Sequence, residues 1–352
     1  MKTHTRFPSG RRLPGNRLSG DFREITGLIV FVLFLLLASA SASSAPAPAD
    51  PVYPRVNPGP WYELAADWPQ KPADIEWAAV PGVAVDAEGN IWISTRRAPS
   101  VQAYAPDGRY LFGWGDAPGA HGLKIDREGY VWTTDIRTHV VQKHKRDGTV
   151  LLTLGVENEA GCDERHFFKP TDLAFASNGD IFVTDGYGNA RVVHFDKDGK
   201  YLSAWGSLGT EDGQFSIPHA IVIDSKDRLY IADRNNGRIQ VYNTDGKLLD
   251  SWKHILIPWV LCITDKDEIW ASGSSPMIWS DGLLGCPPKD QLVMKFNTEG
   301  KLLELQTFPK GIDGQEKPGE LNWVHGIALD AQGNLFLGDI IGKRLQKFVR
   351  RP

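Results

Sequence analysis

Residues 173–185 read LAFASNGDIFVTD, and this short pattern decides the fold. Two apolar segments flank a turn of Ser, Asn, Gly and Asp, an arrangement typical of a β-hairpin. Five further stretches repeat it: VAVDAEGNIWIST (83–95), LKIDREGYVWTTD (123–135), IVIDSKDRLYIAD (221–233), LCITDKDEIWASG (261–273) and IALDAQGNLFLGD (327–339). The chain therefore contains six copies of one hairpin.

Each hairpin belongs to a larger unit. Most copies are followed by a third strand and another turn, and a fourth strand often ends in Trp, as at Trp205. Successive copies begin 40, 50, 48, 40 and 66 residues apart. Four strands repeating at this spacing predict an all-β fold, a six-bladed β-propeller. In the longest interval Pro287 and Pro288 disfavour a strand, so residues 272–290 are expected to form a long loop.

The last copy supplies only three strands before the chain ends. Residues 61–68, WYELAADW, are similar to the fourth strand of other copies, such as YLSAWG at 201–206. We expect this N-terminal strand to complete the last sheet, which would close the ring and cover an open sheet edge. The prediction is one propeller domain over residues 61–352, with no room for a second domain.

The N-terminal region has the pattern of a secretory signal. A basic segment (1–23) precedes an apolar run (28–38) and small residues up to Ala45. This order predicts a signal peptide over residues 1–45 and a secreted or periplasmic protein. The Pro-rich residues 46–60 then form a linker. An uncleaved membrane anchor is the alternative, although the apolar run is shorter than the roughly 20 residues of a stable span.

Composition excludes several classes of protein. The 352 residues are 41% hydrophobic, too many for a disordered chain and too few for a polytopic membrane protein. The net charge is −4 and no basic block follows the N-terminal segment, so a nucleic-acid surface is not expected. We expect a monomer with no membrane span in the mature chain, acting on a small-molecule or peptide-derived substrate.

A column of histidines emerges when the six copies are aligned. The position two residues before each first strand is occupied by Pro81, His121, Thr171, His219, Trp259 and His325. Histidine thus falls on alternate blades, about 120° apart around the channel of a six-bladed ring. Three imidazoles at one mouth predict a metal site with an open position, for which zinc is the best candidate and iron, cobalt or copper also fit. The alternative is three separate channel-lining histidines.

Polar side chains follow the second strand of each copy, at the same mouth. Arg96, Arg137 and Arg234 could bind a substrate carboxylate or be exposed charges. Tyr187 could act as a base if a nearby cation lowered its pKa, or could be an ordinary turn residue. Four aspartates at the start of these segments are interpreted as turn residues that accept backbone N–H groups: Asp135, Asp185, Asp233 and Asp339.

Three blocks resemble a known family. TDGYGNARVVHF (184–195), FSIPHAIVI with YIADRNNGRIQVY (215–242) and HGLKID (121–126) are similar to the propeller domain of peptidyl-α-hydroxyglycine α-amidating lyase, which is built from NHL repeats. The similarity covers roughly residues 75–350. It implies cleavage of a C–N bond to give an amide and glyoxylate.

The resemblance also implies roles for individual residues. Zinc would be held by the three histidines of the column, and Tyr187 would be the catalytic tyrosine. Arg234 and Arg96 would be the two functional arginines, although Arg97 is adjacent to the second position.

The chain departs from that family at several positions. The resemblance implies a calcium ion on the channel axis, bound by the backbone carbonyls of Val83 and Leu123 and by an aspartate after the third histidine. That last position is Gly326, which puts the calcium in doubt, and Trp323 replaces a methionine of the family. We expect no monooxygenase domain beside the propeller, and therefore expect the chemistry to be retained while the natural substrate differs from that of the family.

Two disulfides of the family cannot form here. Their positions correspond to Phe168 with Gly188 and to Tyr230 with Val241. We expect Tyr230 and Val241 to pack instead as a cross-strand apolar pair.

Two other functions remain open at this stage. The chain could be a non-catalytic extracytoplasmic NHL propeller that binds a protein or a small ligand. It could also be a metal-dependent hydrolase such as a lactonase, but propellers of that kind use carboxylate and Asn ligands, whereas this column offers three histidines. Fold alone decides none of these.

Overall fold

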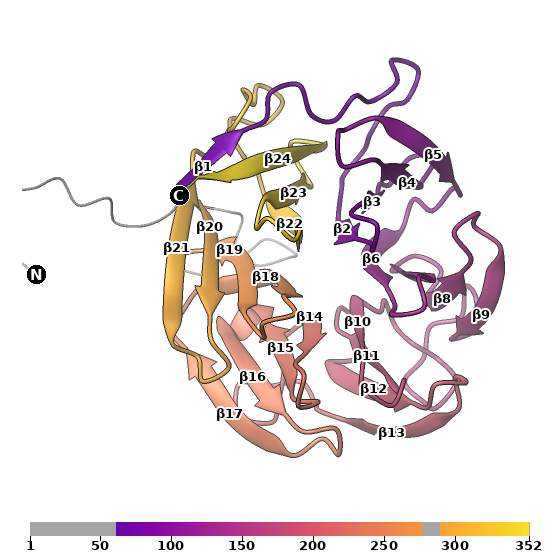
Figure 1. Ribbon diagram of the computed structural model, residues 1–352. Helices are drawn as coiled ribbons and strands as arrows, with labels where there is room; N and C mark the ends of the chain where they lie inside the picture. Colours follow the sequence, from indigo (N-terminus) through magenta and orange to yellow (C-terminus); the bar gives the residue numbers. More distant parts are fainter. Residues whose placement is uncertain (1–60, 277–288, 352) are drawn as a thin grey trace, which may run out of the picture. The chain divides into compact units, whose positions relative to one another are not determined.

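The computed structural model describes residues 61–276 and 289–351. These residues form six four-stranded antiparallel sheets arranged around a centre, which confirms the six-bladed propeller (Figure 1). The predicted signal peptide and linker, residues 1–60, lie outside the described residues, as does most of the loop expected at 272–290. The prediction was wrong for the start of that loop, because residues 272–274 continue a strand. In the described part of the chain no helix is long and apolar enough to cross a membrane.

Each blade runs outward from the centre in the order of its four strands, except the sixth. The innermost strands are β2 (Gly82–Val85), β6 (Ala120–Ile125), β10 (Asp172–Phe175), β14 (Pro218–Ile223), β18 (Ile257–Ile263) and β22 (Val324–Leu329). The second strands are β3 (Ile91–Ser94), β7 (Val131–Asp135), β11 (Ile181–Asp185), β15 (Leu229–Asp233), β19 (Ile269–Ser274) and β23 (Leu335–Asp339).

The outer half of each blade is equally regular. The third strands are β4 (Val101–Tyr104), β8 (Val140–His144), β12 (Arg191–Phe195), β16 (Arg238–Tyr242), β20 (Gln291–Phe296) and β24 (Arg344–Arg351). The outermost strands of blades 1 to 5 are β5 (Tyr110–Trp114), β9 (Val150–Leu154), β13 (Tyr201–Trp205), β17 (Leu248–Lys253) and β21 (Leu302–Phe308). A single 3₁₀ turn, η1 (Arg234–Asn236), follows β15.

The sixth blade takes its outermost strand from the start of the domain. Strand β1 (Trp61–Leu64) pairs antiparallel with β24, from Trp61 opposite Arg351 to Leu64 opposite Phe348. Figure 1 shows this N-terminal strand lying beside β24, which confirms the predicted closure. The closure gives the last three-stranded sheet its fourth strand, so that the edge of β24 is paired rather than open.

The inner hairpins turn through one residue in the left-handed region. In four blades that residue is glycine, at Gly89, Gly129, Gly179 and Gly333. In blades 4 and 5 it is aspartate, at Asp227 and Asp267. Glycine has no Cβ to clash in this conformation, and Asp is one of the few other residues that adopt it at low cost.

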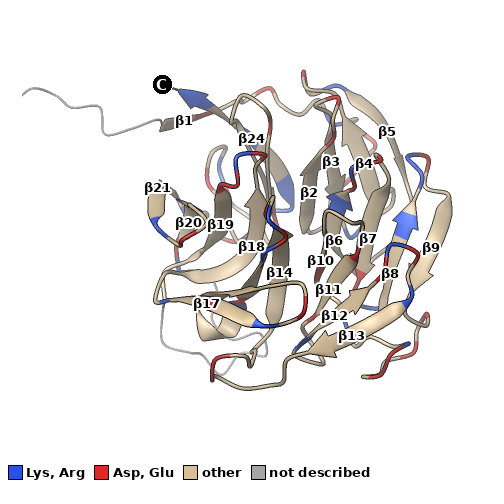
Figure 2. Ribbon diagram, turned by 60° about the horizontal axis from the view of Figure 1, so that its bottom comes forward, with Lys and Arg blue, Asp and Glu red and all other residues tan. Residues whose placement is uncertain are grey.

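The core lies between blades. Six apolar clusters fill the six blade-to-blade interfaces, for example Trp132 of blade 2 with Leu173 and Val183 of blade 3. Both faces of the second strands are therefore covered; β3, β11 and β15, for example, are buried at every position. In Figure 2 the charged residues lie mainly in turns and at strand ends. Charged side chains near the centre of the ring are consequently unusual and informative.

Candidate metal centre

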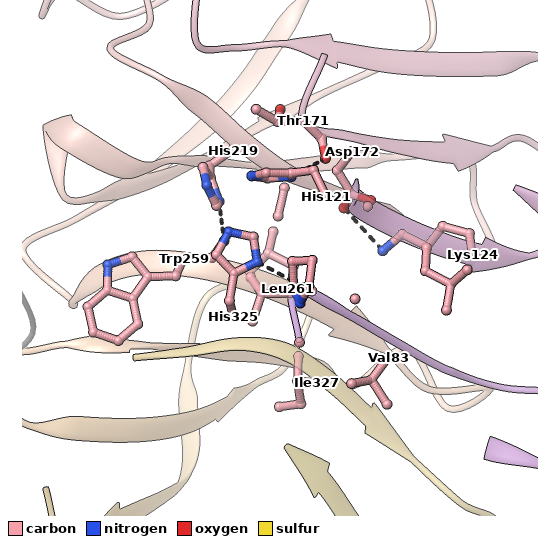
Figure 3. Close-up of a pocket in the computed structure, with 17 residues that line it drawn as sticks. Val83, His121, Lys124, Thr171, Asp172, His219, Trp259, Leu261, His325 and Ile327 are labelled. Carbon is pink, nitrogen blue, oxygen red and sulfur yellow. Dashed lines mark hydrogen bonds and ion pairs between the residues drawn. The ribbon is translucent and has the colours of Figure 1, made fainter. Parts of the chain in front are cut away.

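The three histidines of the column meet at the centre of the ring. His121 is the second residue of β6, and His219 and His325 are the second residues of β14 and β22. All three are buried, and one nitrogen from each lies within 4.8 Å of the other two. The imidazole centroids are 4.5 to 4.8 Å apart, so the three rings surround one point (Figure 3). Alternate blades therefore bring together residues that lie about a hundred positions apart in the sequence.

The three intervening blades fix the orientation of these rings. The Nδ1 atom of each histidine lies against the backbone carbonyl of the column residue on the next blade: His121 on Thr171 at 2.6 Å, His325 on Pro81 at 2.8 Å, and His219 on Trp259. A carbonyl only accepts, so each Nδ1 carries the proton. Each Nε2 is left with its lone pair, which is the tautomer that binds a metal.

Burial keeps these imidazoles neutral. It lowers the pKa of His121 and His219 well below the usual value, with the neighbouring histidine charges acting in the same direction. It lowers the pKa of His325 to about 3. Three neutral nitrogens that converge in a buried place, each held by a partner, form a donor set suited to zinc or a similar ion. The residues thus fit a metal, and these three could hold it.

Tyr187 completes the mouth of this centre. Its hydroxyl oxygen lies 2.8 Å from Nε2 of His219 and 3.2 Å from Nε2 of His121. The residue stands in the turn after β11, between two glycines that close packing requires. A Cβ on Gly186 would lie 2.1 Å from the carbonyl oxygen of Pro218, and one on Gly188 would lie 2.3 Å from the ring of Phe168.

Two arginines lie near Tyr187, and their charges favour the ionised form of its hydroxyl. Arg234, in η1, is buried; its side chain hydrogen-bonds Tyr187, and its guanidinium lies over the ring of Trp323 at 5.4 Å. Arg96 is partly buried and donates from Nε to the carbonyl of Ala120 at 3.1 Å. Burial raises the pKa of Tyr187, and the charges of Arg234 and Arg96 act in the opposite direction.

The other rim arginines are not part of this group. Arg97 is exposed and pairs with Glu76 at 2.8 Å, which resolves the ambiguity between Arg96 and Arg97. Arg137 is exposed as well. The structure therefore brings Arg96, Arg234 and Tyr187 together with the histidines and leaves two arginines out.

The four aspartates at the ends of second strands accept backbone N–H groups, as interpreted from the sequence, but for Asp185 and Asp233 the donor lies 17 residues away and not in the local turn. Asp135 accepts the backbone N–H groups of Arg137 and Thr138. The other three also accept backbone N–H groups: Asp185 from Phe168, Asp233 from Ser216, and Asp339 from Asn322 and Gly342. None of these contacts is to the histidines.

The channel beside the histidines does not fit the calcium that the family resemblance implies. Val83 and Leu123 do line this cavity, but Gly326 offers no carboxylate. A Cβ at Gly326 would lie 2.7 Å from Cγ2 of Val83, so the neighbouring strand leaves no room for a side chain at this position. Among the described residues that line the cavity, the one carboxylate is Asp172, and the ammonium of Lys124 lies 3.1 Å from it.

Apolar packing is found at the two positions where the resemblance to amidating lyases implied disulfides. Tyr230 and Val241 are directly opposite on β15 and β16 and are buried in one cluster, as predicted. At the second position the ring of Phe168 lies against Gly188.

Comparison with known proteins places the chain in a family. The NHL repeat model matches residues 167–195 and 215–242. Human NHL repeat-containing protein 3 is 32% identical over 313 residues, which is 82% of this chain and 84% of that protein. The chain belongs to the NHL repeat-containing protein family.

Amidating lyases are also among the homologues of this NHL-repeat protein. A probable peptidyl-alpha-hydroxyglycine alpha-amidating lyase of Caenorhabditis elegans, pgal-1, is 32% identical over 56% of this chain and 53% of its own length. The peptidylglycine alpha-amidating monooxygenase of Rattus norvegicus is 47% identical over 28% of this chain. The match spans only about half of the nematode protein and 11% of the rat protein.

Sequence reasoning missed part of the site of this NHL-repeat protein. It aligned Pro81, Thr171 and Trp259 with the histidines but did not identify their carbonyls as the acceptors that orient the rings. The alternation of histidine with another residue in one column was the available signal. It also did not identify Lys124 and Asp172 as a pair in the channel.

Proposed function

We propose that the chain is a metal-dependent lyase that cleaves the C–N bond of a peptidyl-α-hydroxyglycine-like substrate, giving an amide and glyoxylate. One observation carries this proposal: three buried imidazole nitrogens converge, and the hydroxyl of Tyr187 contacts two of them beside two arginines. The homology to amidating lyases supports a lyase of this kind.

The histidines would hold zinc through their Nε2 atoms. When bound, the ion would supply Lewis acidity toward the α-hydroxyl of the substrate and a positive charge beside Tyr187. Each Nδ1–H donates to a backbone carbonyl, so the rings need little rearrangement to accept the ion.

Tyr187 would take the hydroxyl proton. Burial disfavours its phenolate, whereas the charges of Arg96 and Arg234 favour it. As the phenolate accepts the proton, the hydroxyl oxygen forms the C=O bond of glyoxylate and the C–N bond breaks. Tyr187 would then give the proton it has accepted to the departing amide nitrogen, which restores the phenolate, so that atoms and charge balance.

The two arginines would bind the substrate carboxylate and orient the α-carbon. A guanidinium can hold a carboxylate by two parallel hydrogen bonds, and both Arg96 and Arg234 lie close enough to Tyr187 to influence its charge. Fixing the carboxylate on one side sets the α-hydroxyl toward Tyr187 and the histidines.

The test is a glyoxylate-release assay on an N-acyl-α-hydroxyglycine, combined with metal analysis. We expect about one metal ion per chain, loss of turnover on chelation, and recovery when zinc is added back. His219→Ala should lose both metal and activity, whereas His166→Ala, on the surface beside Asp163, should keep both. Undiminished turnover in His219→Ala would refute the mechanism.

A non-catalytic binding propeller is the second candidate. It is favoured by one finding: the match to human NHL repeat-containing protein 3 covers 82% of the chain, against 56% for the nematode lyase. Binding of a protein or small ligand should survive removal of the metal, whereas lyase turnover should not.

We further propose that this lyase works outside the cytoplasm as a monomer, as the N-terminal pattern and the closed ring suggest. Mass spectrometry of the secreted chain would test cleavage near Ala45. Light scattering of the purified protein would test the oligomeric state.

A further inference from the structure

One column of the innermost strands lines the channel cavity next to the histidines: Gly82, Gly122, Asp172, Ala220, Val260 and Gly326. In the column two residues further along each strand, Lys124 lines the cavity as well, whereas Ala84, Ala174, Val222, Cys262 and Ala328 do not. Across these columns the charged residues are Asp172 and Lys124, on neighbouring blades. The Nζ atom of Lys124 lies 3.1 Å from Oδ2 of Asp172 (Figure 3).

This ion pair is largely removed from solvent. The side chain of Asp172 is 7% exposed and that of Lys124 is 23% exposed. Oδ1 of Asp172 packs against Gly122, where an added Cβ would lie 3.1 Å from it. Burial raises the pKa of Asp172, and the charge of Lys124 opposes this shift. Removing one partner of such a pair leaves an uncompensated buried charge.

Asp172 joins the strands that carry two of the histidines. Its Oδ2 also accepts the backbone N–H of Ile221 at 3.1 Å. Ile221 lies two residues after His219 on β14, and Lys124 lies three residues after His121 on β6. One carboxylate on β10 thus links blades 2 and 4 across blade 3, whose residue in the histidine column is Thr171.

The residue that precedes β10 orients His121 directly. The residue before Asp172 is Thr171, whose carbonyl accepts the Nδ1–H of His121 at 2.6 Å. Holding Asp172 in place therefore also holds the acceptor that sets this imidazole.

We propose that the ammonium of Lys124, paired with Asp172, occupies the place in this channel that a calcium ion would take. The same ion pair sets the spacing of His121 and His219. Lys124 and Asp172 are positioning residues, because their effect on the metal passes through the histidine strands. Glycine at 326 fits this arrangement, because a second carboxylate is not needed where the cation carries a single charge. The positioning role rests on the proposed metal site, whereas the exclusion of calcium does not.

Calcium titration of the purified, zinc-loaded chain tests the first part. We expect no calcium in metal analysis and no change in Tm when calcium or a calcium chelator is added. In Lys124→Met the carboxylate of Asp172 loses its partner, so Tm should fall and added calcium should now raise it. Stoichiometric calcium in the wild-type chain, or a calcium-dependent rise of its Tm, would overturn the proposal.

Zinc affinity, measured by chelator competition, tests the second part. Lys124→Met should weaken zinc binding by about tenfold or more, the effect expected when the residues supporting metal ligands are removed. Lys124→Arg, which keeps the charge, should recover most of the affinity. The matched control is Lys143→Met, which removes a similarly buried lysine paired with Asp126 at 3.4 Å on the same blade.

The outcomes separate this proposal from the proposed function. Wild-type zinc affinity in Lys124→Met would overturn the positioning role, as would an equal loss in Lys143→Met. If Lys124→Met does not fold, the calcium titration of the wild-type chain still tests the exclusion of calcium, and the zinc affinity of Lys124→Arg still tests the positioning role. A chain that binds zinc but releases no glyoxylate would refute the proposed lyase activity. The calcium titration and the zinc affinities would still test the role of Lys124.

Discussion

The hydroxyl oxygen of Tyr187 lies 2.8 Å from Nε2 of His219, and it also contacts Nε2 of His121 at 3.2 Å. These two nitrogens are the atoms that would bind a metal, because the opposite nitrogen of each ring faces a backbone carbonyl. The phenol therefore stands at the edge of the metal centre, where a proton can pass between it and a substrate held there.

Tyr187→Phe is expected to abolish chemistry without loss of metal. The substitution removes the proposed base but keeps the ring, so kcat should fall about 100-fold or more. Zinc affinity should be unchanged or higher, since the hydroxyl no longer competes for the two Nε2 atoms. Steady-state assays and chelator competition measure the two effects.

The control for this variant is Tyr130→Phe, which alters a tyrosine that lies under Lys143, away from the histidines. It should retain full turnover. Comparable kcat values for Tyr187→Phe and the wild-type chain would rule out Tyr187 as the base.

Arg96 and Arg97 form a matched pair of adjacent arginines with different surroundings. Arg96 is partly buried beside Ala120, whereas Arg97 is exposed and pairs with Glu76. Arg96→Ala should raise KM for a carboxylate-bearing substrate by about 10- to 100-fold, the range of a charged hydrogen bond of roughly 1.5–3 kcal/mol. Arg97→Ala should leave KM unchanged. Equal effects of the two substitutions would contradict the assignment of Arg96.

Asp339 should make stability depend on pH. Burial raises its pKa to about 6, from the usual value of 3.8 for an aspartate. The protonated form is thus favoured in the folded state. The stability that this protonation contributes is fully present below about pH 4 and is lost as the pH rises through about 6. The effect amounts to about 3 kcal/mol at most, since one pKa unit corresponds to about 1.4 kcal/mol.

Asp339→Asn removes this titration, because asparagine does not ionise; its single amide oxygen keeps one of the two acceptor positions that now bind the N–H groups of Asn322 and Gly342. Relative to the wild-type chain, the free energy of unfolding of the variant should rise between pH 4 and 6 and stay level above that. Denaturant unfolding at several pH values measures it. A difference that does not change between pH 4 and 6 would show that Asp339 titrates normally.

Much of the fold could be predicted from the sequence, because the propeller is built from sequence repeats. Six copies of a hairpin define the blades, and their alignment places residues such as His121 and His325 at one mouth. The closing strand was predictable as well, because residues 61–64 have the composition of an outermost strand and the last copy lacked one.

Other features depend on contacts between blades, which repeat alignment does not reveal. The carbonyl of Thr171 orients His121 through its backbone, so the residue type carries no signal. The pairing of Lys124 with Asp172 joins two different columns on neighbouring blades. The choice between Arg96 and Arg97 depends on which of two adjacent side chains faces inward, and the strand ends before this point.

The two indole rings beside Arg234 provide the last prediction. The Arg234 guanidinium lies 5.4 Å from the ring centroid of Trp323, which in turn lies 5.7 Å from that of Trp259. A cation over an aromatic face gains roughly 0.5–2 kcal/mol, so Trp323→Met should raise KM about 2- to 30-fold by loosening Arg234. Trp323→Phe keeps an aromatic face and should lie close to the wild-type value. If the Met and Phe variants have the same KM, the ring face of Trp323 does not hold Arg234, and its position comes from its other contacts, such as the hydrogen bond to Tyr187.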